Sequence, residues 1–272
     1  MPVSSLQIEV KETGSCIATV KVWMHENKLL LNEPKTEYMI LGKASNIRAL
    51  IKPPLIINDF EILPSREAMN LGVIFDDELT LSNHVSSLCN RMFGQIRSIC
   101  LYRKYMTVEV ASQLMVSLVL SKIDYCNSLL AGLPDNLLNK LQRVQNCAAK
   151  VCLNKKKYDH VTPLLITLHW LPVKERIEYK VATLCFKYFD GSLPLYLSDL
   201  LKKPLKVREL RSSKDETLLF VPLKNMTTYG ERAFDYFGPK TWNSLPKEIR
   251  EIKNLNTFKR SLKHYLFTKA FS

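Results

Sequence analysis

The sequence predicts an α+β fold that is mainly α, with a few short antiparallel strands near the start and helices over the rest. Hydrophobic residues make up 46% of the 272 residues and charged residues 24%, which is ordinary globular usage, so most of the chain should fold. Only 8 glycines occur, which disfavours a fold built from many tight turns. Beyond residue 80, apolar residues recur at three- and four-residue spacing, the pattern of helices with one buried face.

The first part of the chain predicts one helix followed by strands. Apolar residues keep a loose helical period over Gly14–Leu31, and Asn32-Glu33-Pro34 then imposes a turn. The strands that follow are short and separated by turn residues, as in small antiparallel sheets. They are Lys35–Gly42, the pair Pro53–Ile57 and Phe60–Leu63 around Asn58-Asp59, and Leu71–Phe75.

The middle of the chain predicts a helical bundle. Ser82 is suited to cap a helix with a regular inward stripe. The stripe consists of Val85, Leu88, Cys89, Met92, Phe93, Ile96, Ile99 and Cys100. Three more helices are predicted over Thr107 to about Ile123, Asn136–Leu153 and Val173–Phe189, the last ended by Asp190-Gly191.

Order weakens after Leu193, where Lys202-Lys203-Pro204 and Arg208–Asp215 indicate a mobile basic linker. Periodicity returns at the end of the chain, in a last helix capped by Thr257. The predicted division is therefore 1–78 for the strand-containing part, 79–200 for the helices, and 201–272 for the linker and a C-terminal helical module.

The charge balance points to nucleic acid as the partner. Lys and Arg number 39 against 26 Asp and Glu, a net charge of +13, and such a potential attracts phosphate polyanions. No apolar run of about 18 residues is present, so no membrane span is predicted. The start has no basic segment followed by an apolar run, so we expect an intracellular protein, cytoplasmic or nuclear.

Catalytic and metal chemistry find little support. Asp76-Asp77 resembles the adjacent carboxylates of metal-dependent polymerases, but no aromatic residue stands two positions before Asp76, and a strand end or helix lead-in is the favoured interpretation. No nucleophile elbow, phosphate loop or dinucleotide motif occurs. The seven cysteines form no close pairs and are predicted to be reduced core thiols, so no zinc, other metal, cofactor or small-molecule substrate is expected.

Basic residues mixed with aromatic ones are the remaining signal. Such mixtures bind a phosphate backbone while the rings stack on exposed bases. One cluster contains Arg97, Tyr102, Arg103, Lys104 and Tyr105, and the other contains Lys155, Lys156, Lys157 and Tyr158.

Several runs closely resemble the C-terminal part of reverse transcriptases from non-LTR retrotransposons of the jockey, CR1 and L2 types. The first is Trp23-Met24-His25-Glu26-Asn27-Lys28 continuing to Asn32-Glu33-Pro34-Lys35-Thr36-Glu37, similar to the end of the family's palm. Met69–Asp76 looks like its primer grip, and the resemblance extends to the last helix through Ser121–Leu130, His169–Val173, Gly230–Phe234 and Trp242–Pro246.

The resemblance implies a palm remnant, a helical thumb and a C-terminal module, with Lys35 in a motif that assists phosphoryl transfer and Leu71-Gly72 as a primer contact. The catalytic aspartates of that family belong upstream of this sequence. We therefore expect a truncated RNA-directed DNA polymerase that is not an enzyme but retains primer-template binding to RNA or DNA. The alternatives are a poorly folded, non-functional transposon product, or part of an active polymerase whose upstream half is missing from the gene model.

Overall fold

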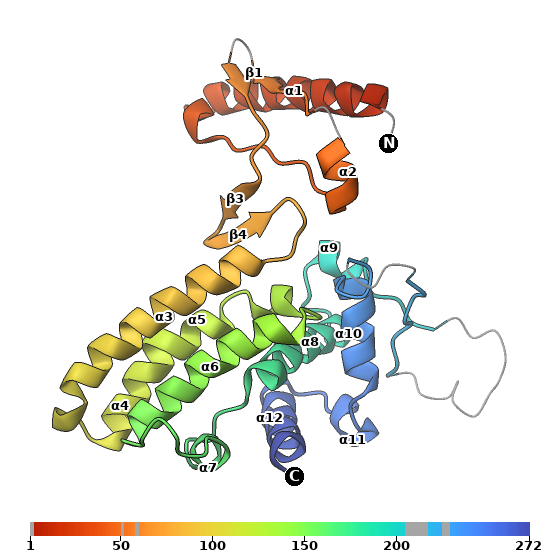
Figure 1. Cartoon of the computed structure of the whole chain (residues 1–272). Helices are drawn as coiled ribbons and strands as arrows, with labels where there is room; N and C mark the ends of the chain where they lie inside the picture. Colours follow the sequence, from red (N-terminus) through yellow and green to blue (C-terminus); the bar gives the residue numbers. More distant parts are fainter. Residues whose placement is uncertain (1–2, 50–51, 58–59, 205–216, 225–228) are drawn as a thin grey trace. The chain divides into compact units, whose positions relative to one another are not determined.

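The structure is a computed structural model that describes residues 3–49, 52–57, 60–204, 217–224 and 229–272. These residues form two compact units, Met1–His84 and Val85–Ser272. Helices dominate, and the strands form two small antiparallel hairpins (Figure 1). The predicted α+β, mainly α fold class is therefore confirmed.

The first unit contains a long helix, α1 (Val3–Glu26), packed against strand β1 (Leu55–Ile57). A Cβ atom on Gly14 would stand 2.8 Å from the carbonyl oxygen of Ile56, so this glycine allows the close approach of helix and strand. Strand β1 pairs with β2 (Phe60–Ile62), which confirms the predicted hairpin, although its turn at 58–59 lies outside the described residues. The small core contains Val10, Leu55, Ile57 and Ile62.

Helix α1 ends at Glu26, before the predicted end at Leu31. Lys28 adopts φ 61°, its N–H donates to the His25 carbonyl at 3.0 Å, and the Leu29 N–H donates to the Met24 carbonyl at 2.8 Å. These two bonds form a Schellman motif, which closes the last turn with one left-handed residue. The predicted turn follows as a short 3-10 helix, η1 (Glu33–Lys35).

The predicted strand over Lys35–Gly42 is wrong. From Thr36 onward the segment is extended, but the backbone bonds that join it to other segments are isolated ones, such as those from Ser65 N to the Tyr38 carbonyl at 2.8 Å and from Gly42 N to the Asp77 carbonyl at 3.1 Å. A strand needs a continuous ladder, and none of the strands in the described ranges pairs with this segment. The short helix α2 (Ala44–Ala49), which the sequence did not predict, comes next.

The second hairpin pairs β3 (Glu67–Asn70) with β4 (Val73–Asp76), with Asn70 opposite Val73. Leu71 and Gly72 form its turn with φ 47° and 81°, the two positive values that a type I′ turn requires. The strand predicted at Leu71–Phe75 is therefore confirmed from Val73 onward.

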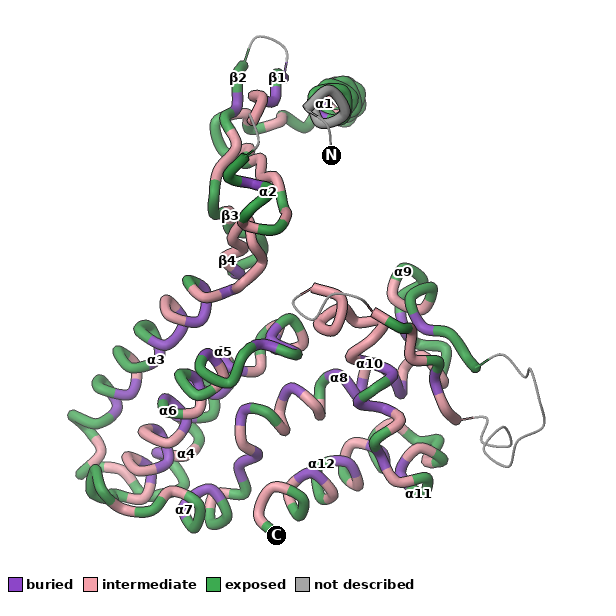
Figure 2. The backbone as a smooth tube through the Cα atoms, turned by 45° about the vertical axis from the view of Figure 1, so that its right-hand side comes forward, coloured by how far each residue is buried: buried purple, intermediate pink, exposed green. Residues whose placement is uncertain are grey.

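Helix α3 (Ser82–Tyr102) begins at the residue predicted to cap it. Most of its predicted inward stripe is buried, but Phe93 and Cys100 are exposed. They lie at the edge of the stripe, whose centre contains the buried Met92 and Ile96. Buried segments recur along the length of α3 (Figure 2). His84 in the first turn is buried, and its Nδ1 accepts a hydrogen bond from Ile74 N at 3.3 Å.

The helix predicted from Thr107 is confirmed as three consecutive segments, with Thr107 as N-cap accepting from Val110 N at 3.3 Å. Its middle segment has π-helical geometry, a wider turn than the α-helical segments on either side. The segments are α4 (Val108–Met115), η3 (Val116–Leu120) and α5 (Ser121–Asp124). A 3-10 turn, η4 (Asn127–Leu130), then leads to α6 (Asp135–Cys152), close to the predicted helix over Asn136–Leu153.

Helix α8 (Val173–Phe189) has the predicted bounds, and Gly191 beyond it has φ 75°. It packs against α10 (Phe234–Asn243) and α12 (Leu255–Phe271). The rings of Phe186 and Phe258 stack at 4.4 Å, and the buried Trp242 lies 5.1 Å from the Phe189 ring. The shorter helices are α7 (Thr162–Thr167), α9 (Leu195–Ser198) and α11 (Lys247–Arg250).

The core that α8 shares with α10 and α12 concerns the predicted division of the chain, and the start of α12 concerns its predicted cap. The compact units separate at residue 84, near the predicted boundary at 78, whereas residues 201–272 belong to the same unit as α8. Most of the predicted linker, Arg208–Asp215, lies outside the described residues. The cap of α12 is Asn254 rather than Thr257, because the Asn254 Oδ1 accepts from the N–H groups of Asn256 and Thr257.

Candidate nucleic-acid interface

The first basic and aromatic cluster lies where α3 meets α4. The 3-10 turn η2 (Arg103–Tyr105) joins these helices, and Lys104 and Tyr105 are both exposed. The Lys104 Nζ stands 4.7 Å from the centre of the Tyr105 ring, a cation–π arrangement. Arg97 is exposed on the preceding part of α3. These positive and aromatic groups are open to a ligand.

The second cluster follows the end of α6. Lys155, Lys156 and Lys157 are all exposed, as is Tyr158, whose ring lies 5.7 Å from the Lys157 Nζ. The loop is ordered by its own backbone, because Lys155 N donates to the Lys150 carbonyl at 2.8 Å and Lys156 N donates to an oxygen of Asp159 at 2.7 Å. The lysine side chains therefore project from a defined turn.

Arg103 holds the two clusters together. Its Nε donates to the carbonyls of Val151 and Cys152 at 2.9 and 3.1 Å, and its Nη2 donates to the Cys152 carbonyl at 2.6 Å. Its Nη1 donates to the Met106 carbonyl at 2.7 Å. A cation at the C-terminal end of a helix also interacts favourably with the helix dipole. The guanidinium thus fixes η2 against the end of α6, from which the second cluster begins.

The structure therefore changes the role assigned to Arg103. The sequence placed it among the binding residues, whereas its donors are occupied by carbonyls of the fold. Burial raises the pKa of the neighbouring Cys152 thiol to about 12, and the positive charge of Arg103 partly opposes that rise. We define the basic end as six of the remaining side chains, those of η2 and of the loop after α6, and leave out Arg97 and Tyr102, which belong to α3. The six are Lys104, Tyr105, Lys155, Lys156, Lys157 and Tyr158.

The other predicted site residues belong to the first unit. Lys35 is exposed at the end of η1, and its N–H donates to the Asn32 Oδ1 at 3.3 Å. Leu71 is 82% exposed at the tip of the β3–β4 hairpin, beside Gly72. An oxygen of Glu37 accepts from Met69 N at 3.1 Å, which joins the segment after Lys35 to this hairpin.

Asp76 and Asp77 have structural partners. The two carboxylate oxygens of Asp76 accept from Thr80 N at 2.8 Å and from Leu81 N at 2.6 Å, so Asp76 organises the approach to α3. The Asp77 carboxylate lies 3.8 Å from the Lys52 Nζ. The interpretation of this pair as a strand end and helix lead-in agrees with these contacts.

The cysteines agree only in part with the core-thiol prediction. Cys89, Cys152 and Cys185 are buried, whereas Cys16 and Cys100 are exposed. Throughout the described residues, no three His, Cys, Asp or Glu side chains lie close enough to form a metal site.

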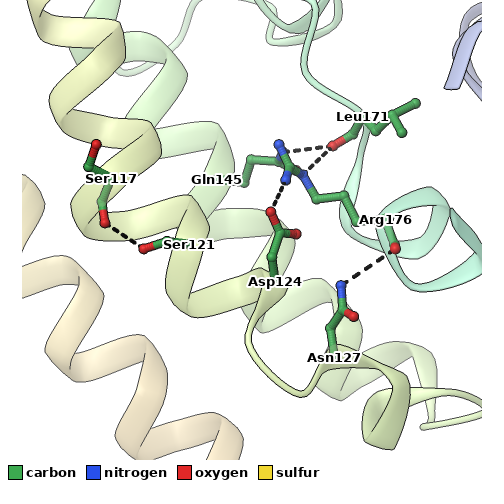
Figure 3. A network of polar contacts seen from close by, with 7 residues as sticks. All are labelled: Ser117, Ser121, Asp124, Asn127, Gln145, Leu171 and Arg176. Atoms are coloured by element: carbon green, nitrogen blue, oxygen red, sulfur yellow. Dashed lines mark hydrogen bonds and ion pairs between the residues drawn. The ribbon is translucent and has the colours of Figure 1, made fainter. Parts of the chain in front are cut away.

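Sequence reasoning missed a polar network in the helical unit (Figure 3). The Arg176 Nη1 donates to an oxygen of Asp124 at 2.7 Å, while the Arg176 Nε and the Gln145 Nε2 both donate to the Leu171 carbonyl. Asp124 and Gln145 are far in sequence from the Leu171 and Arg176 groups that they contact, and no local pattern connects them.

None of the helices in the described ranges is long and apolar enough to cross a bilayer. Comparison of the chain with protein-family models, with curated proteins and with solved structures finds no match. The arguments on function therefore depend on the residues and their geometry.

Proposed function

We propose that this protein binds nucleic acid through the basic end of its helical unit and does not itself catalyse a reaction. The observation that carries the proposal is the position of Arg103, whose contacts bring two exposed lysine and tyrosine clusters to one place. The net charge of +13 adds a long-range attraction for polyanions.

The chemistry of the basic end suits single strands and duplex ends. Its lysines can neutralise phosphates and release counterions, and each such contact lowers log K by about 0.9 per tenfold rise in salt. Tyr105 and Tyr158 are 76% and 88% exposed, and each has a lysine over one face of its ring, so the opposite face can stack on an unstacked base. Stacking on an aromatic ring contributes about 1–3 kcal/mol per base.

The resemblance to non-LTR reverse transcriptases makes a primer-template the natural ligand to test. Within this proposal, the first unit is a palm remnant in which Lys35 and the Leu71-Gly72 turn are additional contacts, and the helical unit corresponds to the thumb and C-terminal module. The absence of catalysis is proposed because both Asp76 carboxylate oxygens are engaged by backbone N–H groups. Incorporation of nucleotides by the purified chain would refute that part.

The test measures binding of a fluorescent RNA–DNA primer-template by anisotropy over a salt series. We expect affinity that falls steeply with salt. The triple variant Lys155→Gln, Lys156→Gln and Lys157→Gln should bind at least about tenfold more weakly, with a salt slope smaller by about 2.7. No binding of the unmodified protein at low salt, or binding indifferent to salt, would refute the proposal.

A matched control separates local contacts from total charge. Lys174, Lys202 and Lys253 are exposed lysines elsewhere in the helical unit. Their combined replacement by glutamine removes the same charge, so it should change the affinity much less than the triple variant at the basic end. Equal losses in the two variants would mean that the basic end is not the site.

One observation supports the alternative of a poorly folded product. Several large apolar side chains of the first unit are exposed, among them Trp23 at 57% and Leu30 at 84%. Contiguous exposed apolar surface promotes association. Sedimentation of the purified protein distinguishes the cases, since a monomer that binds primer-template supports the proposal and an aggregate supports the alternative.

A further inference from the structure

A cavity of about 540 Å³ lies in the helical unit beside the polar network of Figure 3. Residues of α4, η3, α5, η4, the loop before α8, α8 itself and α12 line it. The lining residues that matter here are Asp124, Asn127, Arg176, Tyr179, Lys180 and Lys263. The cavity is large enough for a small organic ligand.

One wall of the cavity is rigid because its polar groups bind one another. Arg176 pairs with Asp124 at 2.7 Å and donates through Nε to the Leu171 carbonyl at 2.9 Å. The Gln145 Nε2 donates to the same carbonyl at 2.8 Å. The charges of Arg176 and Asp124 therefore neutralise each other within this wall.

Asn127 carries the clearest sign of a ligand. Its side chain is 1% exposed, and its Nδ2 donates to the Arg176 carbonyl at 3.4 Å. Its Oδ1 is buried and has no hydrogen-bond partner among the described residues. Buried acceptors are nearly always satisfied. Asn127 is one of the residues that line the cavity, so a small shift of its side chain would bring this oxygen to an N–H or O–H donor of a ligand.

Two lysines give the cavity its net positive charge. Lys180 on α8 and Lys263 on α12 both line it, and both are exposed to solvent. The described residues include no ion pair for either ammonium group. Because Arg176 and Asp124 offset each other, Lys180 and Lys263 remain to attract an anion, and two ammonium groups suit a phosphate.

We propose that this cavity binds a nucleotide. The phosphate pairs with Lys180 and Lys263, and an amino, imino or hydroxyl group donates to the Asn127 Oδ1. The flat base lies among the lining side chains of Leu168, Trp170 and Tyr179. The proposal does not depend on the basic end, since none of the six residues there lines the cavity.

Calorimetry with the four ribonucleoside 5′-monophosphates tests the site, with inorganic phosphate and the free nucleosides as comparison ligands. We expect at least one nucleotide to bind with Kd below about 1 mM, more tightly than phosphate or its nucleoside. Absence of binding by all four, or equal affinity for inorganic phosphate, overturns the proposal.

Variants of the exposed lysines give a test that does not threaten folding. The double variant Lys180→Gln, Lys263→Gln should weaken nucleotide binding by roughly tenfold or more and leave nucleoside binding unchanged. Lys174→Gln, on α8 but outside the cavity lining, is the matched control and should bind as the unmodified protein does. Unchanged affinity in the double variant overturns the proposal.

Asn127→Leu tests the buried acceptor, because leucine has a similar size and accepts no hydrogen bond. If circular dichroism shows a folded variant, nucleotide binding should fall by roughly tenfold. A folded variant with unchanged affinity overturns the role of Asn127, and if the variant does not fold, the lysine pair decides.

The nucleotide could be free or the end of a strand, and competition distinguishes these sources. A short linear 5′-phosphorylated oligonucleotide that displaces the mononucleotide, while a circular one of the same sequence does not, identifies a strand end. If neither oligonucleotide displaces the mononucleotide, the site binds free nucleotide. The triple variant at the basic end should keep mononucleotide binding, so failure of one proposal is distinguishable from failure of the other.

Discussion

Replacing Arg103 by methionine should destabilise the helical unit substantially. The substitution keeps the length and much of the apolar stem but removes the guanidinium donors to the carbonyls of Met106, Val151 and Cys152, of which Val151 keeps a hydrogen bond from Asn154 N. The Val151 and Cys152 carbonyls lie at the end of α6, and the Met106 carbonyl lies directly after η2; the guanidinium is their charged partner. The variant therefore tests whether this contact holds the two segments together.

The expected magnitude follows from the number of bonds. A hydrogen bond with a charged partner contributes about 1.5–3 kcal/mol net. Water can reach some of the released carbonyls, because Arg103 is only partly buried. We therefore expect the free energy of unfolding to fall by about 2–4 kcal/mol, and Tm by roughly 5–12 °C for a unit of this size. Arg103→Lys should lose about half as much, since it keeps the charge but not the forked donors.

Thermal and urea unfolding followed by circular dichroism measure this effect. Arg97→Met is the matched control, because Arg97 is an exposed arginine on α3, and its replacement should change stability by less than about 0.5 kcal/mol. If Arg103→Met is as stable as Arg97→Met, Arg103 does not anchor α6, and the argument that it assembles the basic end fails as well.

Three further predictions concern other parts of the chain. A Cβ atom added at Gly191 or at Gly94 would meet open space, but Gly191 has φ 75° and Gly94 lies in α3. Urea titrations should therefore show that Gly191→Ala lowers the free energy of unfolding by about 1 kcal/mol and that Gly94→Ala raises it by up to about 1 kcal/mol. Burial raises the pKa of the Glu175 carboxyl in the folded protein. The folded state therefore loses stability as the pH rises above the pKa that this carboxyl has in the unfolded chain. Glu175→Gln should raise Tm at about pH 7 and not at about pH 4. Burial also raises the pKa of Cys152 to about 12, whereas Cys16 is exposed, so mass spectrometry should find alkylation of Cys16 in the native protein and of Cys152 only after unfolding.

The long helices were predictable because the features that define them, an apolar stripe and the residues at each end, lie within the helix or next to it. The bounds of α8 agree with the prediction, since Pro172 precedes its first turn and Gly191 supplies the left-handed residue after it. Phe93 was placed inward because hydrophobicity alone does not show where the edge of a stripe lies. The short helices α2, α9 and α11 are too brief to stand by themselves, and their stability comes from contacts that a local pattern does not contain.

The candidate site was predictable in composition but not in geometry. The sequence singled out the lysines of the basic end, since their charge and neighbouring tyrosines are visible in a short window. It did not reveal that Arg103 binds carbonyls 48 and 49 positions away. It also gave no sign that the Asn127 Oδ1 would be buried without a partner, because that depends on how the helices around the cavity meet.

The π-helical segment Val116–Leu120 has a consequence for how this chain tolerates changes in length. A π turn holds one more residue than an α turn, while the α-helical segments before and after it continue along the same axis. Removing one residue from an ordinary helix rotates everything beyond it by about 100° and turns its apolar face away from the core. Here the loss of one exposed residue, such as Ser117, would convert the wide turn into an α turn and leave Met115 and Ile123 facing inward. The segment is therefore the place in this helix where a one-residue deletion can be absorbed without repacking.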